Sequence, residues 1–303
     1  VYNFSDIFFI IKHNENFFID NIFLNIGLLF FLITLFFKLS TVPFHVWVPD
    51  VYEGAPTIIT FFFSIIPKIV FLGFLIRLLT HIFDLNFSNF LYNFIMFGSI
   101  SSLILGSLTS LIQKKIKRLF AYSSIANVGF LLIGPASLNL EGFNASLIYL
   151  FFYSLIVTVL FYLFISIRYL HNNLKMKNIN ELFGFLNNNL LLCCFLLINL
   201  FSLIGIPPLA GFFGKTYLFL IAFSSCLETL FVAALYASII SAVVYLRIIR
   251  IIFFNKIVYF FSYSFEYYTF FLIIILISLL NLFFFLEPSL IFNLGYNILI
   301  NLF

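Results

Sequence analysis

Residues 37–50 read Phe37-Lys38-Leu39-Ser40-Thr41-Val42-Pro43-Phe44-His45-Val46-Trp47-Val48-Pro49-Asp50, and this stretch decides the fold. Lys38 lies near the end of a long apolar run, and Pro43 follows five residues later. A charge is costly at membrane depth and is seldom placed there without a use. Proline cannot donate to the helix ladder, so the helix should break beside the charge. The stretch therefore predicts an ion or proton site at a broken membrane helix, followed by an acidic loop over residues 50–56.

The composition indicates a polytopic membrane protein. Of the 303 residues, 64% are hydrophobic, 22% aromatic and only 9% charged, and the mean hydropathy is +1.19. A soluble domain of this length could not hide so much apolar surface. The apolar runs are long and continuous, which favours helices, because a membrane barrel would show short alternating segments. The predicted fold class is therefore an all-α polytopic membrane protein with about eight transmembrane helices.

Eight apolar stretches are each long enough for a span of about 20 residues. They cover residues 18–46, 57–80, 90–112, 118–137, 145–168, 189–224, 228–254 and 268–286. We expect the chain to divide into an outer-side N-terminal segment over 1–16, a transmembrane domain over 17–286 and an interfacial C-terminal segment over 287–303.

The sixth stretch contains a second break. It is too long for one straight span, and Gly205, Pro207 and Pro208 should unwind it near its middle, close to Lys215. Two interrupted helices are typical of a transporter built from inverted repeats, whose site lies near the bilayer midplane.

The charged loops predict the orientation. If the first span starts on side A, the loops after spans one, three, five and seven lie on side B. Side B then holds Lys114, Lys115, Lys117, Arg118, Arg168, Lys175, Lys177, Arg247, Arg250 and Lys256, whereas side A holds Lys12 and Arg77. The positive-inside rule places side B in the matrix or cytoplasm, and both termini on the outer side.

Lys38, Lys68 and Lys215 are the charges that lie well inside apolar runs. Lys68 lies roughly 11 residues from either end of its span, about 16 Å at the helical rise, which is too far for its ammonium to reach the headgroups. Loss of water around an ammonium favours the neutral amine, so buried lysines suit proton transfer. Three lysines on separate helices, linked by water, predict a horizontal proton relay.

His45 lies just beyond the first break, and two interpretations of it stay open. It could link Lys38 to the matrix side, or it could cap the broken helix at the interface. Both roles are compatible with an imidazole two residues after Pro43.

The remaining motifs predict no further chemistry. The basic run 114–118 is better explained as a topology anchor than as a nucleic-acid patch, so lipids rather than nucleic acid are the expected surroundings. Cys193, Cys194 and Cys226 lack metal-ligand spacing and are expected to be buried thiols. The sequence has no Walker loop, dinucleotide fingerprint or haem ligand pair, so no redox cofactor or metal is expected in this chain.

Four blocks of sequence resemble one known family. They are Phe37 to Trp47 followed by Pro49 to Thr57, then Ser64 to Lys68, Ile116 to Ile125, and Ser202 to Lys215. In this order they closely resemble the NADH-ubiquinone oxidoreductase chain 2 family, the antiporter-like membrane-arm subunits of respiratory complex I. The blocks run through nearly the whole chain.

The resemblance implies a proton-translocating subunit that does not itself carry out redox chemistry. NADH, FMN, iron–sulfur clusters and ubiquinone would then belong to other subunits. Lys38 matches the family's lysine in the half-channel from the matrix, Lys68 the central connecting lysine, and Lys215 the lysine that communicates with the opposite side. The implied location is the mitochondrial inner membrane, with the basic loops in the matrix and other membrane-arm subunits as partners. Since the family also resembles Mrp-type antiporters, sodium/proton exchange is the alternative function.

The chain departs from the family pattern in two places. Asn127 stands where members usually carry a histidine, and asparagine can hydrogen-bond but cannot titrate. The family's first six helices have no counterpart here, including the one with the glutamate that pairs with the lysine matching Lys38. We therefore expect a split subunit, in which a separate chain supplies those helices and that glutamate; genuine loss is the second possibility.

Overall fold

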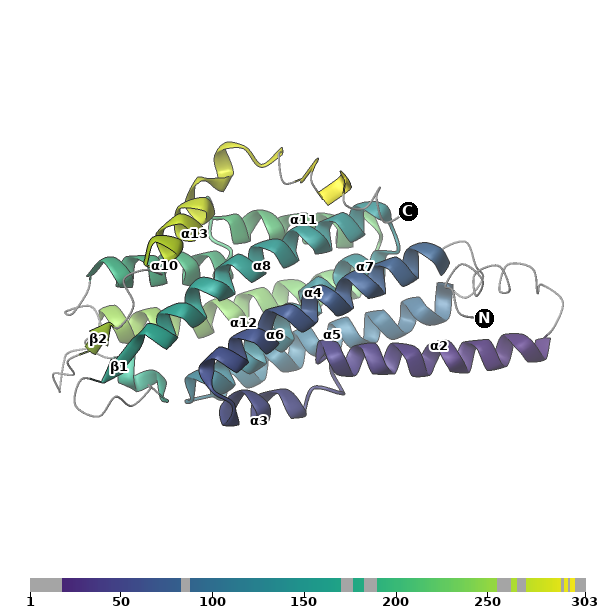
Figure 1. Ribbon diagram of the computed structural model, residues 1–303. Helices are drawn as coiled ribbons and strands as arrows, with labels where there is room; N and C mark the ends of the chain where they lie inside the picture. Colours follow the sequence, from purple (N-terminus) through teal and green to yellow (C-terminus); the bar gives the residue numbers. More distant parts are fainter. Residues whose placement is uncertain are drawn as a thin grey trace.

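The computed structural model describes residues 18–82, 88–169, 177–182, 190–254, 263–265, 271–289, 292–293 and 295–297. Figure 1 shows an elongated bundle of helices that run roughly along one common direction. The predicted segment 1–16 lies outside the described residues, as does much of 287–303, so the domain boundaries remain predictions.

The described helices follow the predicted spans closely. In chain order they are α2 (Phe18–Leu39), α3 (Trp47–Gly54), α4 (Thr57–Ile82), α5 (Ser88–Ile112), α6 (Ile116–Leu131), α7 (Ile133–Ser137), α8 (Leu140–Ser166), α10 (Leu190–Ile204), α11 (Ala210–Ser224), α12 (Glu228–Phe253) and α13 (Phe271–Phe283). Short 3-10 turns follow at Ile179–Leu182 and Phe284–Leu286. Each of the eight predicted spans contains at least one of these helices, which confirms the all-α fold class.

Length and composition identify 5 candidate membrane spans among the described residues: Thr57–Thr80, Tyr92–Ile112, Ile116–Ser137, Leu140–Ile165 and Glu228–Phe253. Shorter apolar helices occupy Ile26–Leu39, Leu190–Ile204, Ala210–Ser224 and Ile274–Leu286. The second and third of these shorter helices are the halves of the predicted broken span, so the break shortens each half below a full span.

The α6–α7 span is the centre of the bundle. In its most apolar window 94% of the residues are buried, against 33% for the α4 span and 39% for the α12 span. Small residues allow the close packing of α5 against α6: a Cβ on Gly106 would lie 2.5 Å from the backbone nitrogen of Ala126. Without water to drive helices together in a bilayer, such close contact supplies much of their attraction.

The loops that were predicted on side B meet at one end of the bundle, here called the basic end. Ile116 N donates to Lys177 O and Ile179 N to Lys114 O, both at 3.0 Å. The short strands β1 (Ile167–Tyr169) and β2 (Tyr263–Phe265) pair antiparallel. Figure 1 shows α3, β1 and β2 together at this end. The described parts of these loops therefore lie at the same end of the bundle.

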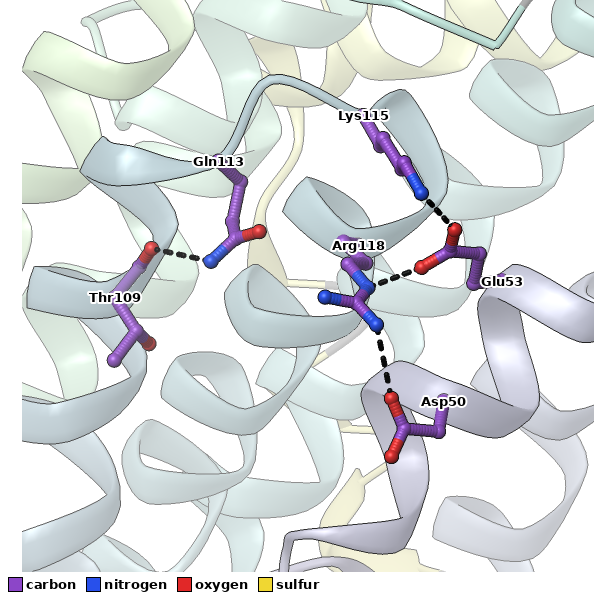
Figure 2. Close-up of polar contacts among 6 residues, drawn as sticks. All are labelled: Asp50, Glu53, Thr109, Gln113, Lys115 and Arg118. Carbon is purple, nitrogen blue, oxygen red and sulfur yellow. Dashed lines mark hydrogen bonds and ion pairs between the residues drawn. The ribbon is translucent and has the colours of Figure 1, made fainter.

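Ion pairs fasten α3 to the basic end (Figure 2). The Glu53 carboxylate pairs with Lys115 and with the Nε of Arg118, and Arg118 Nη2 also lies 3.0 Å from Asp50 Oδ1. Beside them, Gln113 Nε2 donates to the carbonyl of Thr109 at 3.4 Å. These contacts hold the segment that follows the first break against the start of the central α6.

One local prediction was wrong. The acidic segment over 50–56 was predicted as a loop, but most of it belongs to the helix α3. Pro49 lies in the first turn of α3, where proline needs no backbone donor, and the ion pairs hold Glu53 and Asp50. The fourth predicted span comprises α6 and α7, and backbone hydrogen bonds from Leu132 N to Val128 O and from Ala136 N to Leu132 O continue across their junction, so Ile116–Ser137 forms one candidate span.

The apolar core has two halves, with buried polar groups between them. The half at the basic end includes Ile65, Leu119 and Val244, and the other half includes Leu72, Val128 and Ala237. Each of the helices α4, α6 and α12 contributes residues to both halves, so the boundary between the halves crosses all three helices. The buried polar side chains near this junction, called the polar layer below, are Lys68, Ser123, Ser124, Asn127, Tyr149, Tyr153, Ser202, Lys215 and Tyr245.

Candidate proton-relay site

Lys38 lies at the first broken helix, as predicted. It occupies the last turn of α2, which ends at Leu39. Ser40 then adopts a positive φ of 65°, and the backbone stays irregular until Trp47. Lys38 is exposed on the outside of the described structure, and no hydrogen bond or ion pair joins it to a described residue. An uncompensated charge on an apolar exterior is costly in a bilayer.

Aromatic and hydroxyl groups stabilise the first break. The Trp47 indole donates from Nε1 to the carbonyl of Phe37 at 3.2 Å, and the two rings stack with centroids 5.6 Å apart. Thr41 donates through its backbone N to the carbonyl of Phe36 at 3.0 Å. These bonds satisfy carbonyls that the end of α2 leaves open.

His45 lies within the break and is half-buried. Its Nδ1 is buried and has no hydrogen-bond partner among the described residues. Neither of the two interpretations of His45 is decided, since no described contact joins its ring to Lys38 or to a free helix end.

Lys68 is buried in the polar layer, with 3% of its surface exposed. Its Nζ donates to the Tyr153 hydroxyl at 2.8 Å and to the carbonyl of Ser124 at 3.2 Å. Both acceptors are neutral, and they come from α8 and α6. Tyr52 of α3 packs in one cluster with Ala121 of α6, so the segment after the first break also contacts the central helix.

Lys215 lies at the second break, where α10 ends and α11 begins. Gly205 has a φ of +90°, which glycine adopts readily, and a Cβ there would lie 3.2 Å from Lys215 Cδ. Lys215 is 4% exposed, and its Nζ donates to Leu203 O at 2.6 Å and Ile204 O at 3.0 Å. The ammonium thus caps carbonyls at the C-terminus of α10, where the helix dipole favours a cation. Pro207 and Pro208 occupy the break as predicted.

The tyrosines of the polar layer were not singled out by the sequence analysis. Tyr149 OH donates to Asn127 Oδ1 at 2.9 Å, and Tyr245 is buried, with 2% of its surface exposed. Tyr153 accepts from Lys68. The spacing of Tyr149 and Tyr153, four residues apart on a predicted helix, was the available signal. The abundance of aromatic residues obscured it, since 22% of the chain is aromatic.

The structure brings Lys68 and Lys215 into one buried layer but leaves Lys38 at the surface of the described chain. The Phe130 ring lies beside the second lysine, with its centroid 5.3 Å from Lys215 Nζ, and its centroid is 5.9 Å from that of Tyr149. Two of the three lysines of the predicted relay are therefore buried in the described chain, and the relay itself stays a prediction.

The cysteine prediction was partly wrong. Cys193 is buried, but Cys194 and Cys226 are exposed on the described chain. All three are free thiols. Across the described ranges, His, Cys, Asp and Glu side chains form no group of three or more that could hold a metal ion.

The chain resembles curated membrane proteins. It is 40% identical over 233 residues to NADH-quinone oxidoreductase subunit N of Pelagibacter ubique, covering 77% of this chain and 49% of that protein. It is 41% identical over 230 residues to NADH-ubiquinone oxidoreductase chain 2 of Marchantia polymorpha, covering 76% of this chain and 45% of that protein. The chain spans about half the length of these relatives.

Solved structures show the same fold. A chain of respiratory complex I from Thermus thermophilus matches with a TM-score of 0.72 and 29% identity, over 86% of this chain and 57% of that one. A chain of the Mrp complex from Dietzia matches with a TM-score of 0.74 over 88% of this chain and 57% of that one, at 19% identity, and so shares the fold. Residues 1–241 match the family described as "NADH:quinone oxidoreductase/Mrp antiporter, TM". With most of its length matched, the chain belongs to the NADH:quinone oxidoreductase/Mrp antiporter transmembrane family.

Proposed function

We propose that this chain is a proton-translocating membrane-arm subunit of a NADH:ubiquinone oxidoreductase of the complex I type. The observation that carries the proposal is buried Lys68, whose described hydrogen-bond partners are the neutral Tyr153 hydroxyl and Ser124 carbonyl. With no described carboxylate to hold the ammonium form, the amine can release and regain a proton. The relatives named subunit N and chain 2 support the assignment to this complex.

In this proposal the chain takes no part in electron transfer. NADH, FMN, iron–sulfur clusters and ubiquinone bind other subunits, and their redox energy drives protons through Lys68 and Lys215. Lys38 receives protons from the matrix side, with His45 as a possible link. The surroundings are the mitochondrial inner membrane, with the basic end in the matrix, as the positive-inside rule favours.

Because the turn between α11 and α12 lies on the opposite side, exposed Cys226 should react with an impermeant maleimide added from the intermembrane space.

Helices from outside the described residues complete the site at Lys38. We propose that a separate chain supplies these helices, which correspond to the first six of the family, and a glutamate that pairs with Lys38. The exposure of Lys38 on an apolar exterior supports this arrangement, because a charged side chain inside a bilayer is stabilised by a group of opposite charge. Other membrane-arm subunits are the remaining partners.

Replacing Lys68 by alanine in the intact complex, reconstituted in closed vesicles, tests the proton-translocation proposal. We expect NADH-driven proton pumping to fall by roughly 100-fold or more, as for loss of a positioned acid–base group. Lys114→Ala, which changes an amine in the basic loop, is the control and should pump normally.

Unchanged pumping by the Lys68→Ala complex, with assembly verified, would leave a scaffolding role for this chain. Transport that depends on sodium and not on NADH would instead support the antiporter alternative. The similarity to the Mrp complex chain shows a shared fold and does not identify the ion that is transported.

A further inference from the structure

The polar layer contains three buried tyrosines in addition to Lys68 and Lys215. Tyr149 and Tyr153 are on α8, Tyr245 is on α12, and none is more than 4% exposed. A buried hydroxyl away from water costs free energy unless it has a hydrogen-bond partner, so three in one layer need a reason. A phenylalanine would fill the same space, and the chain contains 49 of them.

Two direct hydrogen bonds anchor these groups. Lys68 Nζ donates to Tyr153 OH at 2.8 Å, and Tyr149 OH donates to Asn127 Oδ1 at 2.9 Å. Tyr153 and Tyr245 belong to the same cluster of buried residues.

Tyr149 lies beside the second lysine. A Cβ on Gly214, the residue before Lys215, would lie 3.1 Å from Tyr149 Cδ2. The Phe130 ring packs against both Tyr149 and the Lys215 ammonium. Tyr153 is therefore in direct contact with Lys68, and Tyr149 lies in the immediate surroundings of Lys215.

We propose that the hydroxyls of Tyr153, Tyr245 and Tyr149 are the proton connection between Lys68 and Lys215, and that Asn127 positions the last of them. The inference rests on the proposed function and adds to it the residues that join the two lysines. Asn127 accepts a hydrogen bond from Tyr149, and because its amide does not titrate, the hydroxyls carry the proton.

The transfer is balanced at each group. The Lys68 ammonium gives a proton to the Tyr153 oxygen while that hydroxyl releases the proton it carried, and Tyr245 and Tyr149 do the same in turn. Water molecules carry the proton across the steps that lack a direct hydrogen bond. The Lys215 amine becomes an ammonium, each tyrosine ends with one O–H, and the Asn127 amide neither gains nor loses a proton.

Single Tyr→Phe substitutions in the intact complex test this connection, because they remove the hydroxyl and keep the ring. We expect Tyr153→Phe, Tyr149→Phe and Tyr245→Phe each to lower protons pumped per NADH oxidised by roughly tenfold, less than the loss of a full acid–base group because water can replace a hydroxyl in part. Tyr236→Phe is the matched control: Tyr236 lies on the same helix as Tyr245 but is 48% exposed, and its loss should change nothing.

Two further measurements separate a proton role from a structural one. Assembly and thermal stability of each variant complex should stay within the range of the Tyr236→Phe control, which a purely structural role would not predict. Asn127→His should pump at least as well as the parent, since an imidazole can both position the Tyr149 hydroxyl and carry a proton.

The outcomes distinguish this inference from the proposed function. If Lys68→Ala abolishes pumping and all three Tyr→Phe variants pump normally, the tyrosine connection is wrong and the proposed function stands. If the Tyr→Phe complexes fail to assemble, the hydroxyls are structural and the connection is equally overturned. If Lys68→Ala pumps normally, the proposed function itself fails.

Discussion

Glu53 shows at the residue scale how charge holds the basic end together. Its carboxylate accepts a hydrogen bond from Lys115 and pairs with the Arg118 guanidinium, and these contacts hold the pKa of Glu53 below its usual range. A carboxylate with a lowered pKa stabilises the fold above its unfolded pKa of about 4.3. That stability is lost as the pH falls through the lower, folded pKa.

Glu53→Gln should therefore lower the thermal stability of the complex at neutral pH, and the difference from the parent should vanish at low pH. The expected effect at neutral pH is small, because exposed ion pairs contribute little. Melting temperatures of the two complexes, measured from neutral pH to well below about pH 4, provide the test, because the difference begins to shrink at the unfolded pKa and is lost only below the folded pKa. Asp50→Asn is the control: its side chain is 71% exposed and pairs with Arg118 alone, so its effect should be smaller. A difference that stays constant with pH would contradict this assignment.

Close packing of α5 on α6 decides stability at the element scale. Gly106→Ala would place a Cβ 2.5 Å from the Ala126 backbone, which cannot move without shifting the central helix. We expect a loss of about 1–3 kcal/mol in stability, as for overpacking. Because α6 also carries Ser124 and Asn127, pumping should fall as well.

Gly73→Ala on α4 is the matched control for this packing prediction. A Cβ on Gly73 meets nothing within 4 Å, so alanine there should be neutral or stabilising by about 0.5–1 kcal/mol. Chaotrope or thermal unfolding of the purified complexes measures both effects. Equal stability of the two variants would show that α5 and α6 are not packed as closely as described.

At the whole-molecule scale, Lys38 indicates a partner. A photo-crosslinking residue in place of neighbouring Phe37, which is 45% exposed, should capture a membrane segment containing an acidic side chain when the intact complex is irradiated. Mass spectrometry of the product then tells whether that segment belongs to a separate chain or to a longer form of this one. Crosslinks to lipid alone would contradict the proposed pairing of Lys38.

The sequence predicted the fold well because its signals are local. Apolar runs of span length located the helices, and the prolines near Lys38 and Lys215 located both breaks. The structure differed where tertiary contacts outweigh local signals. The segment after Pro49 is a helix, and ion pairs hold it against the start of α6.

The sequence by itself determined which charges lie in apolar runs and where the helices break, because burying an ammonium and removing a backbone donor have costs that any bilayer imposes. Only the tertiary structure decided which groups meet. It placed Lys68 on the Tyr153 hydroxyl and Lys215 on the carbonyls of α10, and it left Lys38 at the surface. It also assembled Tyr149, Tyr245 and Asn127 from three helices into one polar layer. Such contacts join residues far apart in the chain. Helical periodicity shows which residues share a face of a helix, but it does not show which other helix packs against that face.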